Sequence, residues 1–227
     1  MIDTVFNGLY HKNKGETMKV LLINGSPKEK GCTFTALEEV AKALNNEGIN
    51  TEFFQLGNQP LMGCMGCREC ASIKKCRFDD KVNEFINLAQ EADGFVFGSP
   101  VHYAAAGGAI TSFMDRVFYC NMCAGKTTFY LKPAAAIVSA RRAGTTAALD
   151  QLNKYFTISQ MPLISSRYWN MVHGAKPEDV KQDLEGLQIM RVLGKNMAWF
   201  LKCKEAGLKA GIAFPEQEER IATNFIR

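Results

Sequence analysis

Short apolar runs that alternate with helix-like stretches constrain the fold of this chain more than any other feature of its sequence. Residues 20–23 form a continuous apolar run of the kind found in strands that are covered on both faces. Similar runs predict strands at residues 51–56, 94–100 and 134–140, and a weaker one at 161–166. Between these runs, apolar residues recur every three or four positions, which is the spacing of amphipathic helices. Strand–helix alternation repeated this often predicts an α/β fold in which helices cover both faces of a parallel sheet.

The number of predicted strands distinguishes between the common sheets of this class. Five strands favour a flavodoxin-like, doubly wound sheet with strand order 2-1-3-4-5 over a six-stranded dinucleotide-binding sheet. Apolar residues at helical spacing from Val180 to Leu201 predict a long closing helix. We therefore predict one domain over residues 18–203. A polar extension at residues 1–17, which we expect to be disordered, precedes it, and a charged tail at residues 204–227 follows it.

The bulk composition narrows the classes of partner. The chain has 227 residues, which is enough for one sizeable domain with its own core. It contains no run of about 18 apolar residues that would span a membrane, and its N-terminus lacks the apolar core of a signal peptide, so we expect a cytoplasmic protein. The net charge of +4 is mild, and no block of lysines or arginines indicates a nucleic-acid face. A small anionic ligand suits this composition better than a membrane or a nucleic acid.

The segment between the first strand and the first helix has the composition of an anion-binding loop. It reads NGSPKEKGCTFT, from Asn24 to Thr35. Free N–H groups and the helix dipole favour an anion at such a helix start. The glycines, hydroxyl residues and lysine that could contribute are Gly25, Ser26, Lys28, Gly31, Thr33 and Thr35. The loop lacks both the Gly-Lys-Ser/Thr ending of a nucleotide P-loop and the G-x-G-x-x-G fingerprint, so a monophosphate bound without Mg²⁺ fits best. The alternative is an ordinary strand–helix turn capped by Thr33.

Two further loops are expected beside the first. They read GSPVHY (residues 98–103) and SARRAGTT (residues 139–146), and each follows a predicted strand. A ligand in such a sheet lies outside the carboxyl ends of the strands, where several loops contact it together. Residues 100–103 offer backbone donors, an apolar edge and an aromatic ring, which suit a flat heteroaromatic group. Arg141 and Arg142 could stabilise negative charge on that group.

These motifs together resemble a known family. GSPKEKGCT, GSPVHY followed by FMDR (residues 113–116), and KPAAAIVSARRAGTT resemble the NADPH-dependent FMN reductase family of flavodoxin-like proteins. GCMGCRECASIKKCRFDD (residues 63–80) resembles the cysteine segment of the iron–sulfur flavoprotein branch of that family. The resemblance extends from about Met18 to Lys202.

The resemblance implies FMN as the cofactor and NAD(P)H as the co-substrate. It places the FMN phosphate and ring on three groups of residues: Ser26, Lys28, Cys32 and Thr33 for the phosphate; Pro100, Val101, His102 and Tyr103 against the ring; and Ser139, Arg141, Arg142 and Gly144 on the third side. The flavin carries the chemistry in such proteins, so no catalytic side chain is assigned. Family members are commonly homodimers or homotetramers, and we expect the same here.

Four cysteines form a compact segment. Cys64, Cys67, Cys70 and Cys76 lie within thirteen residues, and the first three have the spacing that begins a bacterial ferredoxin run. Three hypotheses remain open for them: a [4Fe–4S] cluster, which the resemblance permits despite the longer last gap; no metal; and tetrahedral zinc. The pair Cys120-x-x-Cys123 could be a redox dithiol, but two merely buried cysteines are the favoured interpretation.

Three hypotheses for the function follow. The leading one is an FMN-dependent oxidoreductase that transfers electrons from NAD(P)H to a small acceptor such as a flavin or a quinone. The second is an iron–sulfur flavoprotein that carries electrons between ferredoxin and FMN. The third is a non-enzymatic metal or redox sensor that uses the fold as a scaffold.

Overall fold

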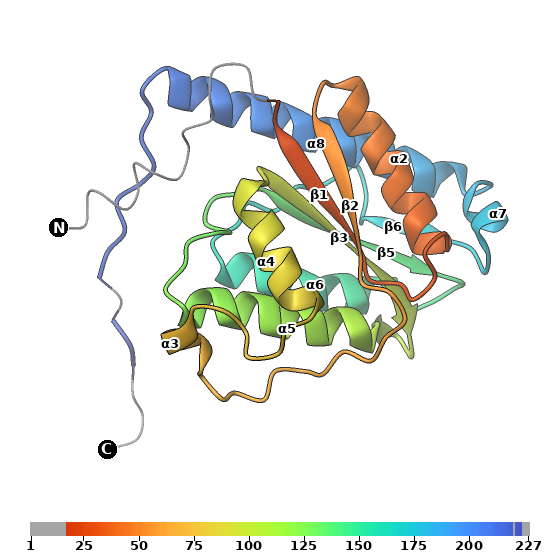
Figure 1. Cartoon of the computed structure of the whole chain (residues 1–227). Helices are drawn as coiled ribbons and strands as arrows, with labels where there is room; N and C mark the ends of the chain where they lie inside the picture. Colours follow the sequence, from red (N-terminus) through yellow and green to blue (C-terminus); the bar gives the residue numbers. More distant parts are fainter. Residues whose placement is uncertain (1–16, 220, 224–227) are drawn as a thin grey trace.

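A computed structural model describes residues 17–219 and 221–223 (Figure 1). The strands are β1 (Lys19–Asn24), β2 (Asn50–Gln55), β3 (Gly94–His102), β4 (Ala105–Ala106), β5 (Ala134–Ala140) and β6 (Met171–His173). The helices are α2 (Cys32–Asn46), α3 (Cys70–Ile73), α4 (Lys81–Glu91), α5 (Gly108–Cys123), α6 (Thr145–Ile158), α7 (Pro177–Val180) and α8 (Leu184–Lys209). Except for Thr17, the predicted N-terminal extension lies outside the described residues.

The sheet confirms the predicted topology. Its main path runs β2-β1-β3-β5-β6 with parallel neighbours throughout, which is the flavodoxin-like order 2-1-3-4-5. The short strand β4 lies off this path and pairs antiparallel with the end of β3. Helices α2 and α8 cover one face of the sheet, and α4, α5 and α6 cover the other (Figure 1). All the crossovers therefore bring the strands' carboxyl ends to one edge of the molecule.

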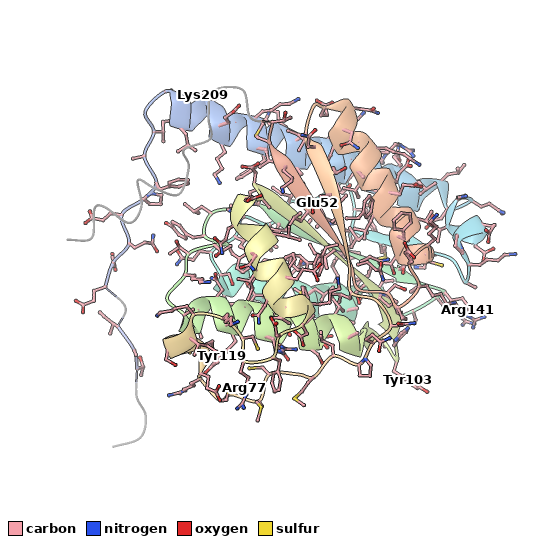
Figure 2. The ribbon with its side chains drawn as sticks, in the orientation of Figure 1. Glu52, Arg77, Tyr103, Tyr119, Arg141 and Lys209 are labelled. Carbon is pink, nitrogen blue, oxygen red and sulfur yellow. The ribbon has the colours of Figure 1, made fainter. Side chains whose placement is uncertain are left out.

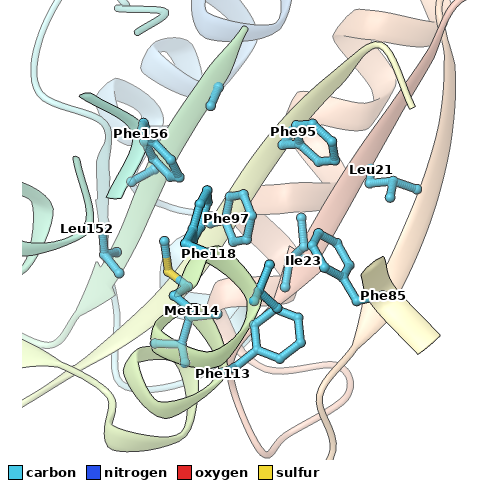
Figure 3. Packing of buried hydrophobic residues seen from close by; sticks show 14 of the residues in the cluster. Leu21, Ile23, Phe85, Phe95, Phe97, Phe113, Met114, Phe118, Leu152 and Phe156 are labelled. Carbon is cyan, nitrogen blue, oxygen red and sulfur yellow. The ribbon is translucent and has the colours of Figure 1, made fainter. Parts of the chain in front are cut away.

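The core consists of two layers, one on each face of the sheet. Successive residues of β1 alternate between them, because side chains of a strand point to opposite faces: Leu21 and Ile23 face α4 and α5, whereas Val20 and Leu22 face α2 and α8. The first layer is rich in phenylalanine (Figure 3); its labelled rings are Phe85, Phe95, Phe97, Phe113, Phe118 and Phe156. These rings meet in tilted and edge-on pairs, such as Phe85 and Phe113 with centroids 5.1 Å apart.

The predicted fifth strand at residues 161–166 is wrong in position. Only Leu163 in that segment bridges β5, at Ala134, and the true edge strand is β6. Between the two, the side-chain amide of Asn170 donates to the Ala136 carbonyl at 3.1 Å and replaces a ladder hydrogen bond. A single side-chain contact of this kind leaves no periodic pattern of apolar residues in the sequence. The sequence pattern therefore does not reveal β6, the strand that follows Asn170.

The predicted closing helix is divided. Helix α7 ends at Val180, and the Asp183 carboxylate then starts α8 by accepting a hydrogen bond from the Gly186 N–H at 2.9 Å. Helix α8 continues past Cys203, the predicted end of the domain, to Lys209. The described tail beyond it runs away from the sheet (Figure 1). Among the described residues, no helix combines the length and the hydropathy needed to cross a membrane.

Candidate functional site

The loop between β1 and α2 is organised around the buried side chain of Asn24. Its amide nitrogen donates to the carbonyls of Lys28 (3.3 Å) and Glu29 (3.2 Å) and to Gln55 Oε1 (2.6 Å). Its Oδ1 accepts from the Ser26 N–H at 3.1 Å. Gln55 in turn donates to the Ser26 carbonyl at 2.7 Å, so β2 also supports the loop. The loop is therefore fixed by the protein itself and is preorganised for a ligand.

The start of α2 has no side-chain cap. Gly31 occupies the N-cap position in an extended conformation, and no side chain accepts a hydrogen bond there. The alternative prediction that Thr33 caps the helix is wrong, because its hydroxyl forms a 2.8 Å hydrogen bond with the Ser139 hydroxyl of β5. Backbone N–H groups of the first turn thus remain available to an anion, as at other helix N-termini that bind phosphate. The neighbouring Cys32 thiol donates to the Gly174 carbonyl (3.6 Å), and burial raises its pKa.

The three predicted loops meet at this end of the sheet. The Gly25 N–H donates to the Gly98 carbonyl at 2.9 Å, and a Cβ at Gly25 would lie 2.7 Å from that oxygen. Gly144 has a positive φ of 93°, and a Cβ there would lie 3.0 Å from the Val101 side chain and collide with Ala104. Glycine is required at both positions because the loops approach each other more closely than any side chain allows.

The loop after β3 is a tight hairpin with unusual residues at its tip. Tyr103 and Ala104, with φ of 49° and 60°, link the antiparallel pairs His102–Ala105 and Val101–Ala106. Two successive positive φ angles define a type I′ turn, which normally contains asparagine and glycine. Tyrosine and alanine are strained there by roughly 1–2 kcal/mol per residue, and such strain is typical of ligand-contacting segments.

The other residues predicted to contact the flavin form a rim around the carboxyl end of the sheet. Tyr103 and His102 are exposed, Pro100 and Val101 are half-buried, and Lys28, Arg141 and Arg142 extend into solvent. Figure 2 shows Tyr103 and Arg141 at the same end of the molecule. The uncapped helix start, the close backbone contacts and the aromatic and cationic rim fit a flat anionic ligand such as FMN, with its phosphate at α2.

The cysteine segment lies along α5. Arg116 of α5, only 2% exposed, holds the segment through a two-point ion pair with Asp80, at 2.6 and 2.9 Å. It also donates to the Cys76 sulfur at 3.2 Å and lies over the Phe78 ring at 5.1 Å. Burial lowers the pKa of Arg116, but its hydrogen bonds to Asp80 and Cys76 outweigh this effect and raise the pKa overall. Arg116 is therefore a fixed positive charge beside the cysteine segment.

One small cavity gathers the predicted metal ligands. Its volume is about 20 Å³, and the cysteines that line it are Cys64, Cys67, Cys70, Cys76 and Cys120. Cys64 and Cys67 are largely exposed. Within the described part of the chain, no three His, Cys, Asp or Glu side chains are placed to share one metal ion. The donor chemistry thus suits a thiolate-bound metal or cluster, but the sulfurs do not converge on one point.

The cavity lies apart from the loop end of the sheet. Tyr119 and Arg77, which line it, lie to the left of Tyr103 along the lower side of the molecule in Figure 2. From Gly108, the first residue of α5, the helix rises about 12 Å to Arg116 and about 18 Å to Cys120, both of which line the cavity. The two candidate sites are therefore separated along α5.

The sequence interpretation missed the role of α5 in this cavity. Arg116, Cys120 and Cys123 are spaced at i, i+4 and i+7, which places them on one face of the helix. That spacing was the available signal. The neighbouring Asp115 accepts a hydrogen bond from Tyr155 of α6 at 2.5 Å. Cys120 is buried, as predicted, and Cys123 is half-buried.

Comparison with known proteins identifies the family of the chain. Residues 18–176 match the NADPH-dependent FMN reductase family. An iron–sulfur flavoprotein of Methanocaldococcus jannaschii is 32% identical over 194 residues, which cover 82% of this chain and 98% of that protein. One from Archaeoglobus fulgidus is 28% identical over 193 residues, covering 81% and 97%. A flavodoxin from the domain Archaea has the same fold, with a TM-score of 0.55 at 14% identity over 82% of this chain and 99% of that one. The chain therefore belongs to the NADPH-dependent FMN reductase family, in its iron–sulfur flavoprotein branch.

Proposed function

We propose that this FMN-dependent oxidoreductase accepts electrons from NAD(P)H and passes them to a small acceptor such as free flavin or a quinone. The observation that carries the proposal is the meeting of three loops at the uncapped start of α2, joined by the Gly25–Gly98 and Thr33–Ser139 hydrogen bonds. When bound, FMN supplies the hydride and electron chemistry, and the protein binds and orients it.

The residues around the site divide into those that hold the flavin phosphate and those that face the substrates. N–H groups of the first turn of α2 hold the phosphate, with Lys28 supplying charge from the rim. The exposed Tyr103 offers an aromatic face to the ring or to a substrate. The exposed Arg141 and Arg142 provide positive charge for the anionic part of NAD(P)H or for the reduced ring.

Anaerobic mixing of the FMN-loaded chain with NADPH or NADH tests this function. We expect the oxidised flavin absorbance to be lost with either or both donors and to return when a flavin or a quinone is added. The loss of flavin absorbance should be compared between Arg141→Ala, Arg142→Ala and a control, Lys30→Ala. The control removes an exposed cation from a different loop, the phosphate loop. Reduction by dithionite but by neither nicotinamide would contradict the proposal.

A second candidate function is an electron carrier in which a [4Fe–4S] cluster on Cys64, Cys67, Cys70 and Cys76 exchanges electrons between ferredoxin and FMN. Three observations favour it. The four cysteines line one cavity, and Arg116 donates to the Cys76 sulfur as groups around a metal centre commonly do. The two archaeal relatives named above are both called iron–sulfur flavoproteins.

Anaerobic reconstitution with iron and sulfide tests this second function. The wild-type chain should take up both, and Cys67→Ala should abolish the iron while FMN remains bound, because the phosphate loop lies elsewhere. Cys203→Ser, at an exposed position of α8, is the matched control and should keep the iron. Reconstituted wild-type chain without iron or sulfide would contradict the cluster, and zinc in its place would indicate a structural metal.

A further inference from the structure

A large groove lies beside the cysteine cavity and apart from the flavin loops. Its volume is about 820 Å³, and its lining comes mainly from the second half of α5, the end of α6 and the loop at residues 125–130. This volume falls in the range of sites that bind small molecules, about 300–1,000 Å³. Cys64 and Tyr119 line both the groove and the cysteine cavity, so the two adjoin.

The walls of the groove are mainly aromatic. Phe118 lies 4.8 Å from Phe129 and 5.7 Å from Tyr155, measured between ring centroids, and all three rings line the groove. Met122 and Ile158, which also line it, are 52% and 80% exposed. Aromatic walls pack well against flat rings, by offset stacking or by edge contact. The walls therefore favour a ligand of fused aromatic rings over a sugar or an aliphatic chain.

The described tail after α8 forms a further wall of the groove. Gln217 lines the groove and donates to the Tyr130 hydroxyl at 2.5 Å. The Tyr130 hydroxyl donates in turn to the Pro215 carbonyl at 3.5 Å, and the Phe214 ring lies 6.4 Å from the Tyr130 ring. The groove is therefore built from the tail as well as from two helices and a loop.

Two hydrogen-bond acceptors of α5 line the groove and have capacity for a donor. Asn121 is 9% exposed, and its amide nitrogen donates to the Lys126 carbonyl at 2.9 Å. Its buried Oδ1 has no hydrogen-bond partner among the described residues, and such an acceptor is costly to leave unsatisfied. Asp115 accepts the Tyr155 hydroxyl on Oδ1, which leaves its second oxygen for another donor.

The spacing and charge of the polar groups restrict the ligand further. Asp115 and Asn121 are six residues apart on α5, a rise of about 9 Å, which is close to the length of three fused aromatic rings. Lys126, which also lines the groove, can donate its ammonium group to a carbonyl. Burial and the hydrogen bond to Asp115 raise the pKa of Tyr155, so its hydroxyl keeps its proton and Asp115 keeps its partner. A matching ligand has hydroxyl donors at its ends and a carbonyl acceptor.

We propose that this groove binds a flat, hydroxylated aromatic ketone of the hydroxyanthraquinone class. One hydroxyl donates to Asp115, another donates to Asn121, and a ring carbonyl accepts from Lys126. The groove needs neither a metal on the cysteine segment nor a flavin to bind this ligand, so the proposal stands apart from both candidate functions given above.

Equilibrium dialysis of the FMN-loaded chain against anthraflavic acid tests the proposal. This anthraquinone has one hydroxyl at each end of its fused rings, and the bound FMN already occupies the flavin site. We expect saturable binding of one molecule per chain with FMN retained. Anthraquinone disulfonate has the same rings with a sulfonate in place of each hydroxyl. It should bind at least about tenfold more weakly, because it offers no donor to the two acceptors.

A pair of carboxylate variants tests the position of the ligand. Asp115→Ala changes an exposed residue and should weaken the binding of anthraflavic acid at least about tenfold, without weakening that of the disulfonate. Asp150→Ala removes an exposed carboxylate of α6 that does not line the groove, and it should bind anthraflavic acid as the wild type does. Matching far-ultraviolet circular dichroism checks that both variants fold.

Three results would overturn the proposal. The first is the absence of saturable binding by the wild-type chain, whether the groove stays empty or a second copy of the chain covers it. The second is equal affinity for the two anthraquinones, or equal loss of binding in Asp115→Ala and Asp150→Ala. The third is release of FMN as anthraflavic acid binds, because that would place the ligand in the flavin site.

Discussion

At the scale of single residues, a hydrogen bond between the hydroxyl groups of Thr33 and Ser139 joins two loops of the flavin site. Each residue is at most 5% exposed, and the two oxygens are 2.8 Å apart. In such a pair one hydroxyl donates to the other, so one hydroxyl proton remains free to donate to an anion beside it. The pair therefore couples the order of the loop to the binding of the phosphate.

Replacing Thr33 by valine removes the hydroxyl while it keeps the shape of the side chain. A hydrogen bond to a charged group contributes about 1.5–3 kcal/mol, so the dissociation constant for FMN should rise roughly tenfold to a hundredfold. Quenching of FMN fluorescence measures this constant. Thr33→Ser keeps the hydroxyl and should bind FMN within a few-fold of wild type; equal loss in both variants would show that only packing matters here.

Gly25 can be tested by adding a single methyl group. In Gly25→Ala the Cβ would meet the Gly98 carbonyl and the Ile110 side chain, both at 2.7 Å. Overpacking of this kind typically costs about 1–3 kcal/mol, so we expect that loss in the free energy of unfolding, measured by urea denaturation. Gly108→Ala is the matched control, because nothing lies within 4 Å of a Cβ there. A stable Gly25→Ala variant would contradict the close approach of β1 and β3.

The sequence predicted the residues of the loops better than their contacts. The glycines, hydroxyls and arginines were expected at one end of the sheet and lie there, because parallel strands bring their carboxyl ends together. The Thr33–Ser139 bond could not be predicted, since it joins residues 106 positions apart. The sequence named Tyr103 as a ring contact but did not predict the positive φ angles of Tyr103 and Ala104, because neither residue type favours positive φ.

At the scale of elements, α5 connects the loop end of the sheet to the cysteine cavity. Its N-terminus follows the hairpin at residues 98–107, and its face carrying Arg116 packs against the cysteine segment. The Asp80 carboxylate caps α4 by accepting from the Val82 N–H at 3.1 Å, and it also binds Arg116. One carboxylate thus fixes the end of the segment to two helices.

Removing the Arg116 charge should loosen this junction. Breaking a buried ion pair by deleting one partner costs about 3–5 kcal/mol, and the 33% exposure of the Asp80 side chain reduces the expected loss in Arg116→Met to roughly 2–3 kcal/mol. Urea denaturation measures the loss. The double variant Arg116→Met, Asp80→Asn should recover part of it, because the carboxylate is no longer left unpaired. Additive losses would mean that the two groups do not interact.

The elements that the sequence predicted correctly are those with a clear apolar pattern. The strands β1, β2, β3 and β5 lie at short apolar runs, and the main helices lie between these runs, where apolar residues recur at helical spacing. The edge strand β6 has three residues and follows a loop whose Asn170 replaces a ladder bond, so its pattern is too short to recognise. The α5 face carrying Arg116, Cys120 and Cys123 was readable from spacing, but its partner segment was not.

At the scale of the whole molecule, the end of α8 introduces a dependence of stability on pH. Lys204 is half-buried there, and its ammonium group donates to the Leu131 carbonyl at 2.9 Å. Burial, reinforced by the nearby charge of Lys132, lowers the pKa of Lys204 from 10.5 to about 7, although Asp93 acts in the opposite direction. The unfolded chain therefore binds more protons than the folded chain between about pH 7 and pH 10.5.

Stability should consequently rise with pH across this window, because the penalty for a buried ammonium disappears as Lys204 loses its proton in the folded state. Urea denaturation at pH 6.5, 8 and 9.5 measures the slope. Lys204→Met should flatten the slope of stability against pH. Lys202→Met, in the same helix α8, removes an exposed ion pair with Glu47 and should leave the slope close to that of wild type. Equal slopes in all three proteins would contradict the buried position of Lys204.

The central claim is that three loops of one sheet form a site for a flavin monophosphate. Comparing the affinities of the flavin-free chain for FMN and for riboflavin, which lacks the phosphate, tests it most directly. Backbone N–H groups at the start of α2 should form several charge-assisted hydrogen bonds with the phosphate, so FMN should bind at least about a hundredfold more tightly. Equal affinity for the two flavins, measured by fluorescence quenching, would contradict the account.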